Sequence, residues 1–239
     1  MNDDEKIIEE INNINWWHTI DLGKYGLTNG KVTSMVEKIM MPDDFTDKSV
    51  LDIGAVDGLY SFEAEKRNAK RVLAVDGQAW NPNNTITSNT AKNGYTGTTY
   101  KQGFNLARKL LNSKVEDMYI EDFEEGLNVE TVGQFDVVLC LGVLYHMKYP
   151  FKFLHKLKEM TKETLILETH TDANIDYAWK SIGIPVMAFY PGKELNNDET
   201  NWWGPNIPCL LMMLDSVGFK QVKITYISPS HRIFLQAFV

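Results

Sequence analysis

The stretch from Ser49 to Asp76, SVLDIGAVDGLYSFEAEKRNAKRVLAVD, constrains the fold more than any other part of the chain. An apolar run over 50–53 carries one carboxylate, Asp52, and then breaks at Gly54. A helical pattern follows, and a second apolar run over 72–75 ends in Asp76. The stretch therefore predicts a β-α-β unit with a carboxylate at the carboxyl end of each strand. Ligands of open α/β sheets bind at those strand ends.

The turn between the first strand and the helix indicates the kind of ligand. Asp76 lies 22 residues past Gly54, close to the spacing at which a carboxylate holds ribose hydroxyls. The turn reads Gly-Ala-Val-Asp-Gly and lacks the middle glycine of the G-x-G-x-x-G pattern, which binds pyrophosphate. The carboxylate of Asp57 repels phosphate and suits a cation such as S-adenosylmethionine. The alternative is a plain β-α-β turn in which Asp57 caps the helix.

The remaining pattern alternates strands with helices, which is typical of a parallel, doubly wound sheet. The last two predicted strands form an antiparallel hairpin, so we expect an α/β fold with seven strands. Besides the first two strands, we predict strands at 115–120, 135–141, 164–167, 221–227 and 232–238, and helices at 4–14, 31–41, 83–93, 104–113, 150–161 and 207–217.

The segment 170–205 interrupts this alternation. It is rich in aromatic residues and contains three prolines. Long ordered insertions in α/β enzymes often form lids or substrate pockets. A small satellite core at the sheet edge is the alternative, and the two interpretations are compatible. The aromatic residues are Tyr177, Trp179, Phe189, Tyr190, Trp202 and Trp203.

Composition limits the classes of partner. The chain has 239 residues, of which 44% are hydrophobic, and a formal net charge of −8. This charge argues against general affinity for nucleic acid, although it leaves room for a local basic groove. The separated Cys140 and Cys209 are expected to be buried thiols in a reducing compartment. The acidic start, MNDDEKIIEE, and the lack of a membrane-spanning apolar run predict a cytoplasmic protein.

Several motifs together resemble a known family. Leu51-Asp52-Ile53-Gly54, Asp76, Asp122 and Phe135–Val138 resemble the class I S-adenosylmethionine-dependent methyltransferases, which have a Rossmann-like fold. Gly142-Val143-Leu144-Tyr145-His146 is similar to the subgroup that contains tRNA wobble-uridine carboxymethyltransferases and small-molecule methyltransferases. The motifs WHTIDL at 17–22, FYPG at 189–192 and NWW at 201–203 are similar to those of uncharacterised members. The resemblance runs from about residue 16 to the end and implies one methyltransferase domain over 46–239, preceded by a helical or lid segment over 1–45.

The resemblance also implies a set of residues that bind S-adenosylmethionine. Ala55-Val56 depart from the common pattern, which has Gly or Cys-Gly there. The implied contacts are Gly54 and Gly58 under the methionine part, Asp52 near its amino group, Asp76 at the ribose hydroxyls, Asp122 at the adenine amino group, and Leu141, Gly142 and Tyr145 at the methyl end.

Methyl transfer to a hydroxyl requires a base within hydrogen-bond reach of the acceptor. His146, Glu168 and His170 follow the fourth and fifth strands and are the candidate bases. His146 as a helix cap and Glu168 as a structural residue are the alternatives. Five further residues are candidate substrate contacts, and His18 among them could join the bases: Trp17, His18, Tyr190, Trp202 and Trp203. With Trp16, the tryptophans form either an aromatic roof or part of the core.

Missing residues exclude several reactions. After the fourth strand the chain lacks the Asp or Asn, two prolines and aromatic residue of the amino-group methyltransferases that act on nucleic-acid bases. It also lacks the acidic ligands that metal-dependent catechol-type enzymes have there. Cys140 does not follow a proline, as the nucleophile of cytosine-carbon methyltransferases does. Tyr145 matches a position that holds the extra carboxylate in carboxymethyl transfer, but the expected arginine is not evident in 201–204. Ordinary S-adenosylmethionine is therefore the expected donor.

We expect metal-independent methyl transfer to a hydroxyl of a small-molecule, natural-product or glycan acceptor. One alternative is a tRNA wobble-uridine modifying enzyme, for which Lys101, Arg108, Lys109 and Lys114 offer a weak basic groove. The other alternative is a non-catalytic S-adenosylmethionine-binding protein.

Overall fold

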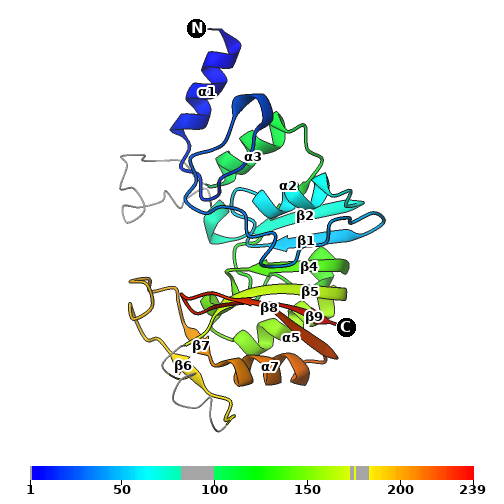
Figure 1. The fold of residues 1–239 in the computed structure, drawn as a ribbon, viewed down its shortest axis with the longest axis vertical. Coiled ribbons are helices and arrows are strands. Elements are labelled where there is room, and N and C mark those ends of the chain that lie inside the picture. The colour runs from blue at the N-terminus through cyan, green and yellow to red at the C-terminus, as the bar shows by residue number, and fades with distance from the viewer. Residues whose placement is uncertain (1, 82–99, 173–174, 176–182) are drawn as a thin grey trace. The chain divides into compact units, whose positions relative to one another are not determined.

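The computed structural model describes residues 2–81, 100–172, 175 and 183–239 (Figure 1). Seven of its strands form one sheet, which confirms the predicted α/β sheet, mostly parallel with an antiparallel pair at the C-terminus. Their order is β3 (Glu116–Tyr119), β2 (Arg71–Asp76), β1 (Ser49–Ile53), β4 (Phe135–Leu141), β5 (Thr161–His170), β9 (Arg232–Phe238) and β8 (Gln221–Ile227). The chain forms two compact units. Unit 1 comprises Met1–Met35 and Pro42–Asp122, and unit 2 comprises Val36–Met41 and Phe123–Val239.

Unit 1 contains the β-α-β stretch from which the fold was predicted. Its three strands are parallel, and the apolar residues of β1 and β2 are buried because both faces are covered. The helix α1 begins at a capping box in which Asn2 and Glu5 bond each other's backbone N–H. The elements are α1 (Asp3–Asn13), η1 (Gly23–Tyr25), β1 (Ser49–Ile53), α2 (Leu59–Lys66), β2 (Arg71–Asp76), η2 (Gln78–Trp80), α3 (Tyr100–Leu110) and β3 (Glu116–Tyr119).

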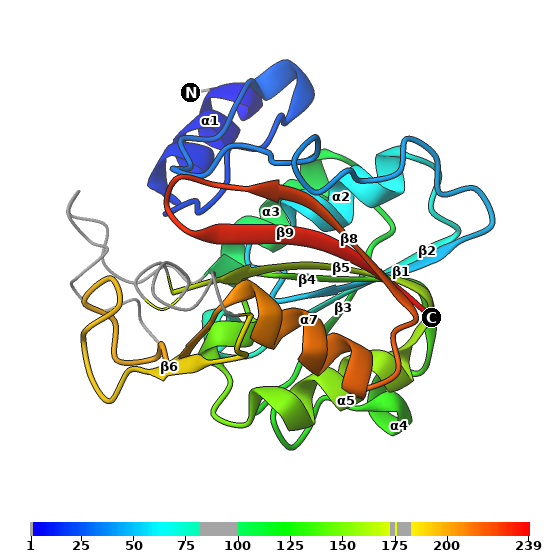
Figure 2. The same ribbon diagram turned by 60° about the horizontal axis from the view of Figure 1, so that its bottom comes forward.

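Unit 2 contains the remaining strands. β4 and β5 are parallel, and β9 lies antiparallel between β5 and β8. Figure 2 shows α5 and α7 on one face of these strands. Proline at the start of α5 and of α7 fixes φ where the backbone N–H needs no partner. The elements are α4 (Val129–Val132), β4 (Phe135–Leu141), η3 (Leu144–His146), α5 (Pro150–Met160), β5 (Thr161–His170), β6 (Met187–Phe189), β7 (Trp203–Pro205), α7 (Ile207–Ser216), β8 (Gln221–Ile227) and β9 (Arg232–Phe238).

The helix predicted over 31–41 is wrong. Residues 36–40 form turns, and Met40 has φ of +48°. The amide nitrogen of Gln236 donates to the carbonyl oxygens of Ile39 at 3.1 Å and Met40 at 2.8 Å. A tertiary contact therefore holds the turn that stands where the helix was predicted, and such contacts override helix propensity. The helix predicted near 83–93 lies outside the described residues.

The strand predicted at 164–167 is longer than its apolar run. β5 extends from Thr161 to His170 because it pairs with β4 from Thr161 onward and with β9 from Thr164↔Phe238 to His170↔Arg232. Side chains alternate along a strand, so Glu168 and His170 lie on the same face. This register places two predicted site residues next to each other.

The aromatic segment contains a small two-stranded sheet of its own. β6 and β7 pair antiparallel, with Ala188 opposite Gly204. Tyr177 and Trp179 lie outside the described residues. Among the described helices, none combines the length and the hydropathy that crossing a membrane requires.

Candidate active site

The turn after β1 has an unusual backbone. Gly54, Val56 and Gly58 all have positive φ, at +76°, +55° and +89°. A Cβ at Gly58 would lie 2.6 Å from Phe104 and 2.7 Å from Phe62, so the position has no room for a side chain. The family departure at Val56 therefore places a β-branched residue in the left-handed region, which costs about 1–2 kcal/mol. Two hydrogen bonds hold it there: the Val56 N–H donates to Asp76 at 2.8 Å, and Trp80 Nε1 donates to the Val56 carbonyl.

Asp52 and Asp76 lie at the carboxyl ends of β1 and β2, as predicted, and both are buried. The Ser61 hydroxyl donates to Asp52 at 2.6 Å, and Asp76 accepts the Val56 N–H. Burial raises the pKa of each carboxyl to about 6. Two carboxylates and a glycine turn are the acceptor set that an amino group and ribose hydroxyls require. These residues of unit 1 therefore fit the predicted cofactor.

These raised pKa values predict a pH dependence of stability. An unfolded Asp ionises near pH 4, whereas Asp76 in the fold ionises near 6 because it is buried. The folded state therefore binds the proton more tightly, and its contribution to stability is present below about pH 4 and lost as the pH rises through about 6. We expect Asp76→Asn to gain stability relative to the natural protein between pH 4 and 6, measured by urea unfolding at both pH values. Parallel pH curves for the two proteins would contradict this assignment.

Asp57 does not face an open ligand site, contrary to our expectation from the turn sequence. Its carboxylate is fully buried and accepts the backbone N–H groups of Trp17 at 2.7 Å and His18 at 2.8 Å, and it also contacts Nδ1 of His18. Asp57 does not cap α2 either: the N-cap residue of α2 is Gly58, and no side chain bonds to the free N–H groups there. Asp57 instead fastens the N-terminal segment to the turn of unit 1.

The N-terminal aromatic residues differ from one another in environment. Trp16 is core: it is 2% exposed, and its Nε1 donates to the Ile11 carbonyl at 2.9 Å. Trp17 is 38% exposed and packs edge-on against Tyr100, so it remains a candidate contact. His18 is buried against Tyr60.

The predicted adenine contact, Asp122, is exposed and follows the end of β3. The neighbouring Ile120 N–H donates to the Asp76 carbonyl at 3.0 Å. Unit 1 thus brings the ends of β2 and β3 together, and the role of Asp122 stays a prediction.

In unit 2, an arginine that sequence reasoning missed lies beside the residues that follow β4. Gly142 has φ of +76°, and a Cβ there would lie 3.6 Å from both Arg232 and the Tyr145 hydroxyl. Arg232 comes from β9, lies over the Tyr145 ring at 4.7 Å and donates to its hydroxyl at 3.2 Å. The register His170↔Arg232 positions it, and no local motif signals it.

Glu168 holds Arg232 through both carboxylate oxygens. Nε of Arg232 contacts Oε1, and Nη2 donates to Oε2 at 2.6 Å. Glu168 is only 2% exposed, and the carboxylate raises the pKa of the guanidinium against the effect of burial. Because both oxygens are engaged, this geometry argues against Glu168 as the base and favours the structural alternative.

His146 is held by the aromatic segment. Its Nδ1 lies 3.0 Å from the Thr200 carbonyl oxygen, which can only accept, so Nδ1 carries the proton. Burial lowers the pKa of His146, which keeps the ring neutral near pH 7 with a lone pair on Nε2. His146 therefore remains a candidate base.

His170 and Tyr190 lie against each other. His170 Nε2 is 3.1 Å from the Tyr190 hydroxyl, which donates to Asp172 at 2.7 Å. Burial and the charge of Arg232 lower the pKa of His170 to about 4. Burial also raises the pKa of Tyr190, so its hydroxyl keeps its proton. A Cβ at Gly204 would lie 2.3 Å from the Tyr190 hydroxyl, so this glycine makes room for the contact.

The aromatic segment packs beside these residues. The backbone N–H of Trp202 donates to the Tyr145 carbonyl at 2.9 Å, and the indole Nε1 of Trp203 donates to the Lys148 carbonyl at 3.0 Å. Phe189, 52% exposed, packs against both tryptophan rings. These contacts support the satellite-core interpretation for the described part of 170–205 and leave Trp202 and Trp203 half-buried near Tyr145.

Asn201, to which we assigned no role from the sequence, is a further polar residue of this cluster in unit 2. It is 2% exposed, and its Nδ2 donates to the Leu195 carbonyl at 2.8 Å. Its Oδ1 is buried and has no hydrogen-bond partner in the part of the chain that the structure describes. A buried oxygen without a partner is costly, which makes it a candidate acceptor for a ligand.

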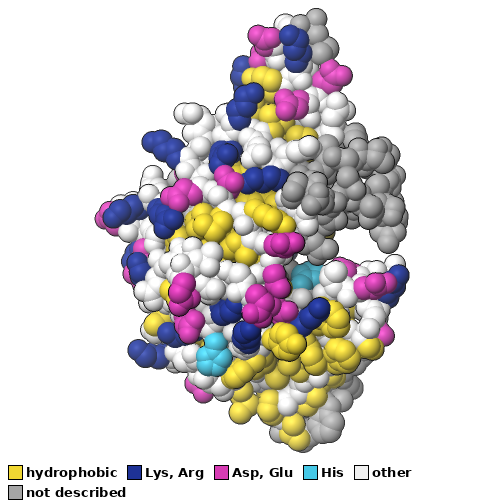
Figure 3. Space-filling view, turned by 180° about the vertical axis from the view of Figure 1, so that it is seen from behind, with side chains coloured by type: hydrophobic (Ala, Val, Ile, Leu, Met, Phe, Trp, Pro, Cys, Tyr) yellow, Lys and Arg dark blue, Asp and Glu magenta, His cyan; other side chains and the backbone are white. Residues whose placement is uncertain are grey.

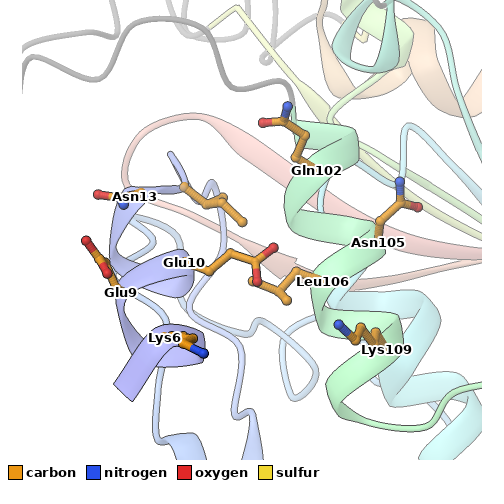
Figure 4. Close-up of a pocket in the computed structure, with 9 residues that line it drawn as sticks. Lys6, Glu9, Glu10, Asn13, Gln102, Asn105, Leu106 and Lys109 are labelled. Atoms are coloured by element: carbon orange, nitrogen blue, oxygen red, sulfur yellow. The ribbon is translucent and has the colours of Figure 1, made fainter. Parts of the chain in front are cut away.

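Unit 1 also contains a cavity of about 620 Å³ between α1 and α3. Figure 4 shows Glu10 on α1 opposite Leu106 and Lys109 on α3. None of the predicted site residues lines it. Among the described residues, no group of three or more His, Cys, Asp or Glu is arranged to hold a metal ion.

Comparisons with known proteins agree with this geometry. The family model described as methyltransferase domain matches residues 30–209. The chain is 26% identical over 187 residues to tRNA U34 carboxymethyltransferase of Pasteurella multocida (strain Pm70), covering 77% of this chain and 49% of that protein. It is 26% identical over 185 residues to the same enzyme of Helicobacter acinonychis (strain Sheeba), covering 74% of this chain and 58% of that protein. The chain thus spans about half the length of these curated relatives.

A solved structure shows the same fold. The N-terminal domain of EvdMO1, crystallised with S-adenosylhomocysteine and D-fucose, is 16% identical, with a TM-score of 0.68 over 100% of this chain and 98% of that one. The family match covers most of the chain, and the carboxylates and glycine turn of unit 1 fit the cofactor. The chain therefore belongs to the methyltransferase domain family and carries a class I domain that uses S-adenosylmethionine.

Proposed function

We propose that the protein transfers a methyl group from S-adenosylmethionine to a hydroxyl of a small-molecule, natural-product or glycan acceptor. The main observation in favour of a small acceptor over tRNA is that two cations of the predicted basic groove are paired with a carboxylate. Lys101 and Arg108 both pair with the carboxylate of Asp117 on β3. A carboxylate between two cations removes much of the positive potential that a phosphate backbone would need.

A third residue of the predicted groove lies near carboxylates. Lys109 lines the α1–α3 cavity together with Glu9 and Glu10. Figure 3 shows Lys and Arg side chains interspersed with Asp and Glu over the described part of one face. With a net charge of −8, this distribution favours a small acceptor over tRNA.

The unit 2 cluster suits a hydroxylated acceptor. Half-buried tryptophan rings can stack on a sugar or a flat ring, and His170 and Asn201 offer hydrogen-bonding groups. EvdMO1 was crystallised with D-fucose, which makes deoxysugars the first acceptors to examine. This similarity supports the choice of probe.

Methyl transfer requires no covalent intermediate with the protein. S-adenosylmethionine, when bound, supplies a methyl group on a good leaving group. The residues of this chain would bind the donor (Asp52, Asp76), orient the acceptor and exclude water. Orienting the acceptor in line with the methyl–sulfur bond is worth about 7–11 kcal/mol.

The second candidate is tRNA wobble-uridine carboxymethylation, favoured by the named relatives and by Arg232 beside Tyr145. An extra carboxylate on the cofactor would need a free cation in a buried site. Glu168 already neutralises Arg232 through both oxygens. This pairing favours ordinary S-adenosylmethionine as the donor.

The test is formation of S-adenosylhomocysteine with a panel of acceptors: D-fucose, other monosaccharides, phenolic hydroxyls and bulk tRNA. We expect turnover with a hydroxyl acceptor, none with its matched deoxy analogue, and none with tRNA. Asp76→Ala should abolish turnover together with cofactor binding, because it removes the proposed ribose contact. Turnover with tRNA would favour the second candidate. Cofactor binding without turnover of any acceptor would favour a non-catalytic protein.

A further inference from the structure

A chain of hydrogen bonds in unit 2 ends at a histidine near the ends of β4 and β5. The Tyr190 hydroxyl donates a hydrogen bond to Asp172 Oδ2 at 2.7 Å, and the Tyr190 oxygen lies 3.1 Å from His170 Nε2. His170 and Tyr190 are 9% and 8% exposed. The three residues come from β5, from the segment just after it and from the residue that follows β6, so only the fold brings them together.

The direction of these bonds decides where His170 carries its proton. The Tyr190 hydroxyl has a single hydrogen, which it donates to the Asp172 carboxylate, because an ionised carboxylate can only accept. The tyrosine oxygen must then accept from His170, so Nε2 carries the hydrogen. Nδ1 is left with a lone pair.

The position of Nδ1 matters because of the neighbours of His170. His170 shares a face of β5 with Glu168 and pairs with Arg232 across the sheet. Glu168 and Arg232 contact the site of Gly142 and Tyr145, at the end of β4. Ligands of such sheets bind at these ends. His170 is therefore beside the methyl end predicted for the cofactor.

We propose that Asp172 and Tyr190 are positioning residues that fix His170 as the Nε2–H tautomer, and that its Nδ1 receives the proton of the acceptor hydroxyl. This inference rests on the proposed function and assigns its base. The proton leaves the acceptor oxygen as the carbon–oxygen bond forms, while the electron pair of the broken methyl–sulfur bond stays on sulfur. The imidazolium that results is stabilised by Asp172 through the Tyr190 hydroxyl and then loses a proton to water.

A weak base suffices for this step. The oxygen becomes positively charged as it gains the methyl group, which makes its proton far more acidic than that of a free alcohol. The low pKa of His170, about 4, keeps the ring neutral and its lone pair available near pH 7. The alternative base, His146, begins a similar chain: its Nδ1 lies 3.0 Å from the Thr200 hydroxyl, which donates to Asp198 at 2.7 Å. Thr200 is exposed, however, whereas Tyr190 is buried, so solvent can replace the Thr200 contact more easily.

The first test reads the tautomer directly, by nitrogen-15 NMR of the histidine rings, with the His170 signals assigned from His170→Gln. We expect a bare Nδ1 and a protonated Nε2 in the natural protein. Tyr190→Phe should give a mixture of tautomers, because Nε2–H loses its partner. Tyr226→Phe, a matched hydroxyl deletion on β8 in the same unit, should leave the His170 signals unchanged. A protonated Nδ1 in the natural protein, or no change in Tyr190→Phe, would overturn the relay.

The second test uses a hydroxyl acceptor that is turned over. His170→Gln should lower kcat by about a hundredfold or more. Tyr190→Phe and Asp172→Asn should each lower kcat by about tenfold, the effect of one hydrogen bond, with the acceptor KM within about twofold. A change confined to KM, or an unchanged kcat in folded His170→Gln, would refute the catalytic role. Absence of hydroxyl methylation by the natural protein would instead reject the proposed function, while the NMR measurement still judges the relay.

Discussion

Replacing Arg232 by methionine is expected to lower the free energy of unfolding by about 3–5 kcal/mol. The substitution leaves the carboxylate of Glu168, which is 2% exposed, without its cation. Removing one partner of a buried pair costs more than the pair itself contributes, because the remaining charge is uncompensated. Tyr145 also loses the guanidinium that packs on its ring and donates to its hydroxyl. Urea unfolding followed by tryptophan fluorescence measures the effect.

A double-mutant cycle distinguishes this cause from loss of packing. Glu168→Leu combined with Arg232→Met removes both charges, so the pair of changes should cost less than the sum of the single ones. Lys152→Met, which breaks an exposed pair with Glu125, is the matched control and should change stability by less than about 1 kcal/mol. Additive single effects would show that charge compensation is not the cause.

Replacing Asp57 by alanine is expected to lower the free energy of unfolding by about 2–4 kcal/mol and to loosen residues 17 and 18. The change leaves two backbone N–H groups and the His18 ring without their buried acceptor. Each such unsatisfied group costs about 1–3 kcal/mol before relaxation. Hydrogen exchange at the amides of Trp17 and His18 should rise, and affinity for S-adenosylhomocysteine should fall because Asp57 is part of the 54–58 turn.

Two variants make the Asp57 experiment specific. Asp57→Asn keeps the shape and one acceptor oxygen, so its loss of stability should lie between that of alanine and none. Asp43→Ala removes a fully exposed carboxylate that pairs with Arg67 in the same unit and should have little effect. Unchanged exchange at residues 17 and 18 in folded Asp57→Ala would contradict the proposed clamp.

The strands β1, β2, β4 and β5 could be predicted from sequence because each contains an apolar run between clear breaks. The predicted bounds 135–141, 221–227 and 232–238 are those of β4, β8 and β9. The same logic placed Asp52 and Asp76 at the ends of β1 and β2. These features depend on local sequence and on the rule that parallel strands end together.

The rest depended on contacts between distant residues. Gln236, 196 residues from Met40, donates to the Met40 carbonyl and holds the turn that replaces the predicted helix over 31–41. Arg232 is 64 residues from Glu168, and Asp57 is 39 residues from His18. No short motif encodes such pairs. For the same reason, the sequence suggested a ligand for Asp57 where the fold supplies Trp17 and His18.

The most direct test of the proposed activity follows a labelled methyl group. Purified protein is incubated with deuteromethyl-labelled S-adenosylmethionine and a fractionated cell extract, with Asp76→Ala as the matched control. We predict label in the small-molecule or glycan fraction, on oxygen, and none with the variant. Label in the tRNA fraction, or in no fraction while the protein binds the cofactor, would contradict this account.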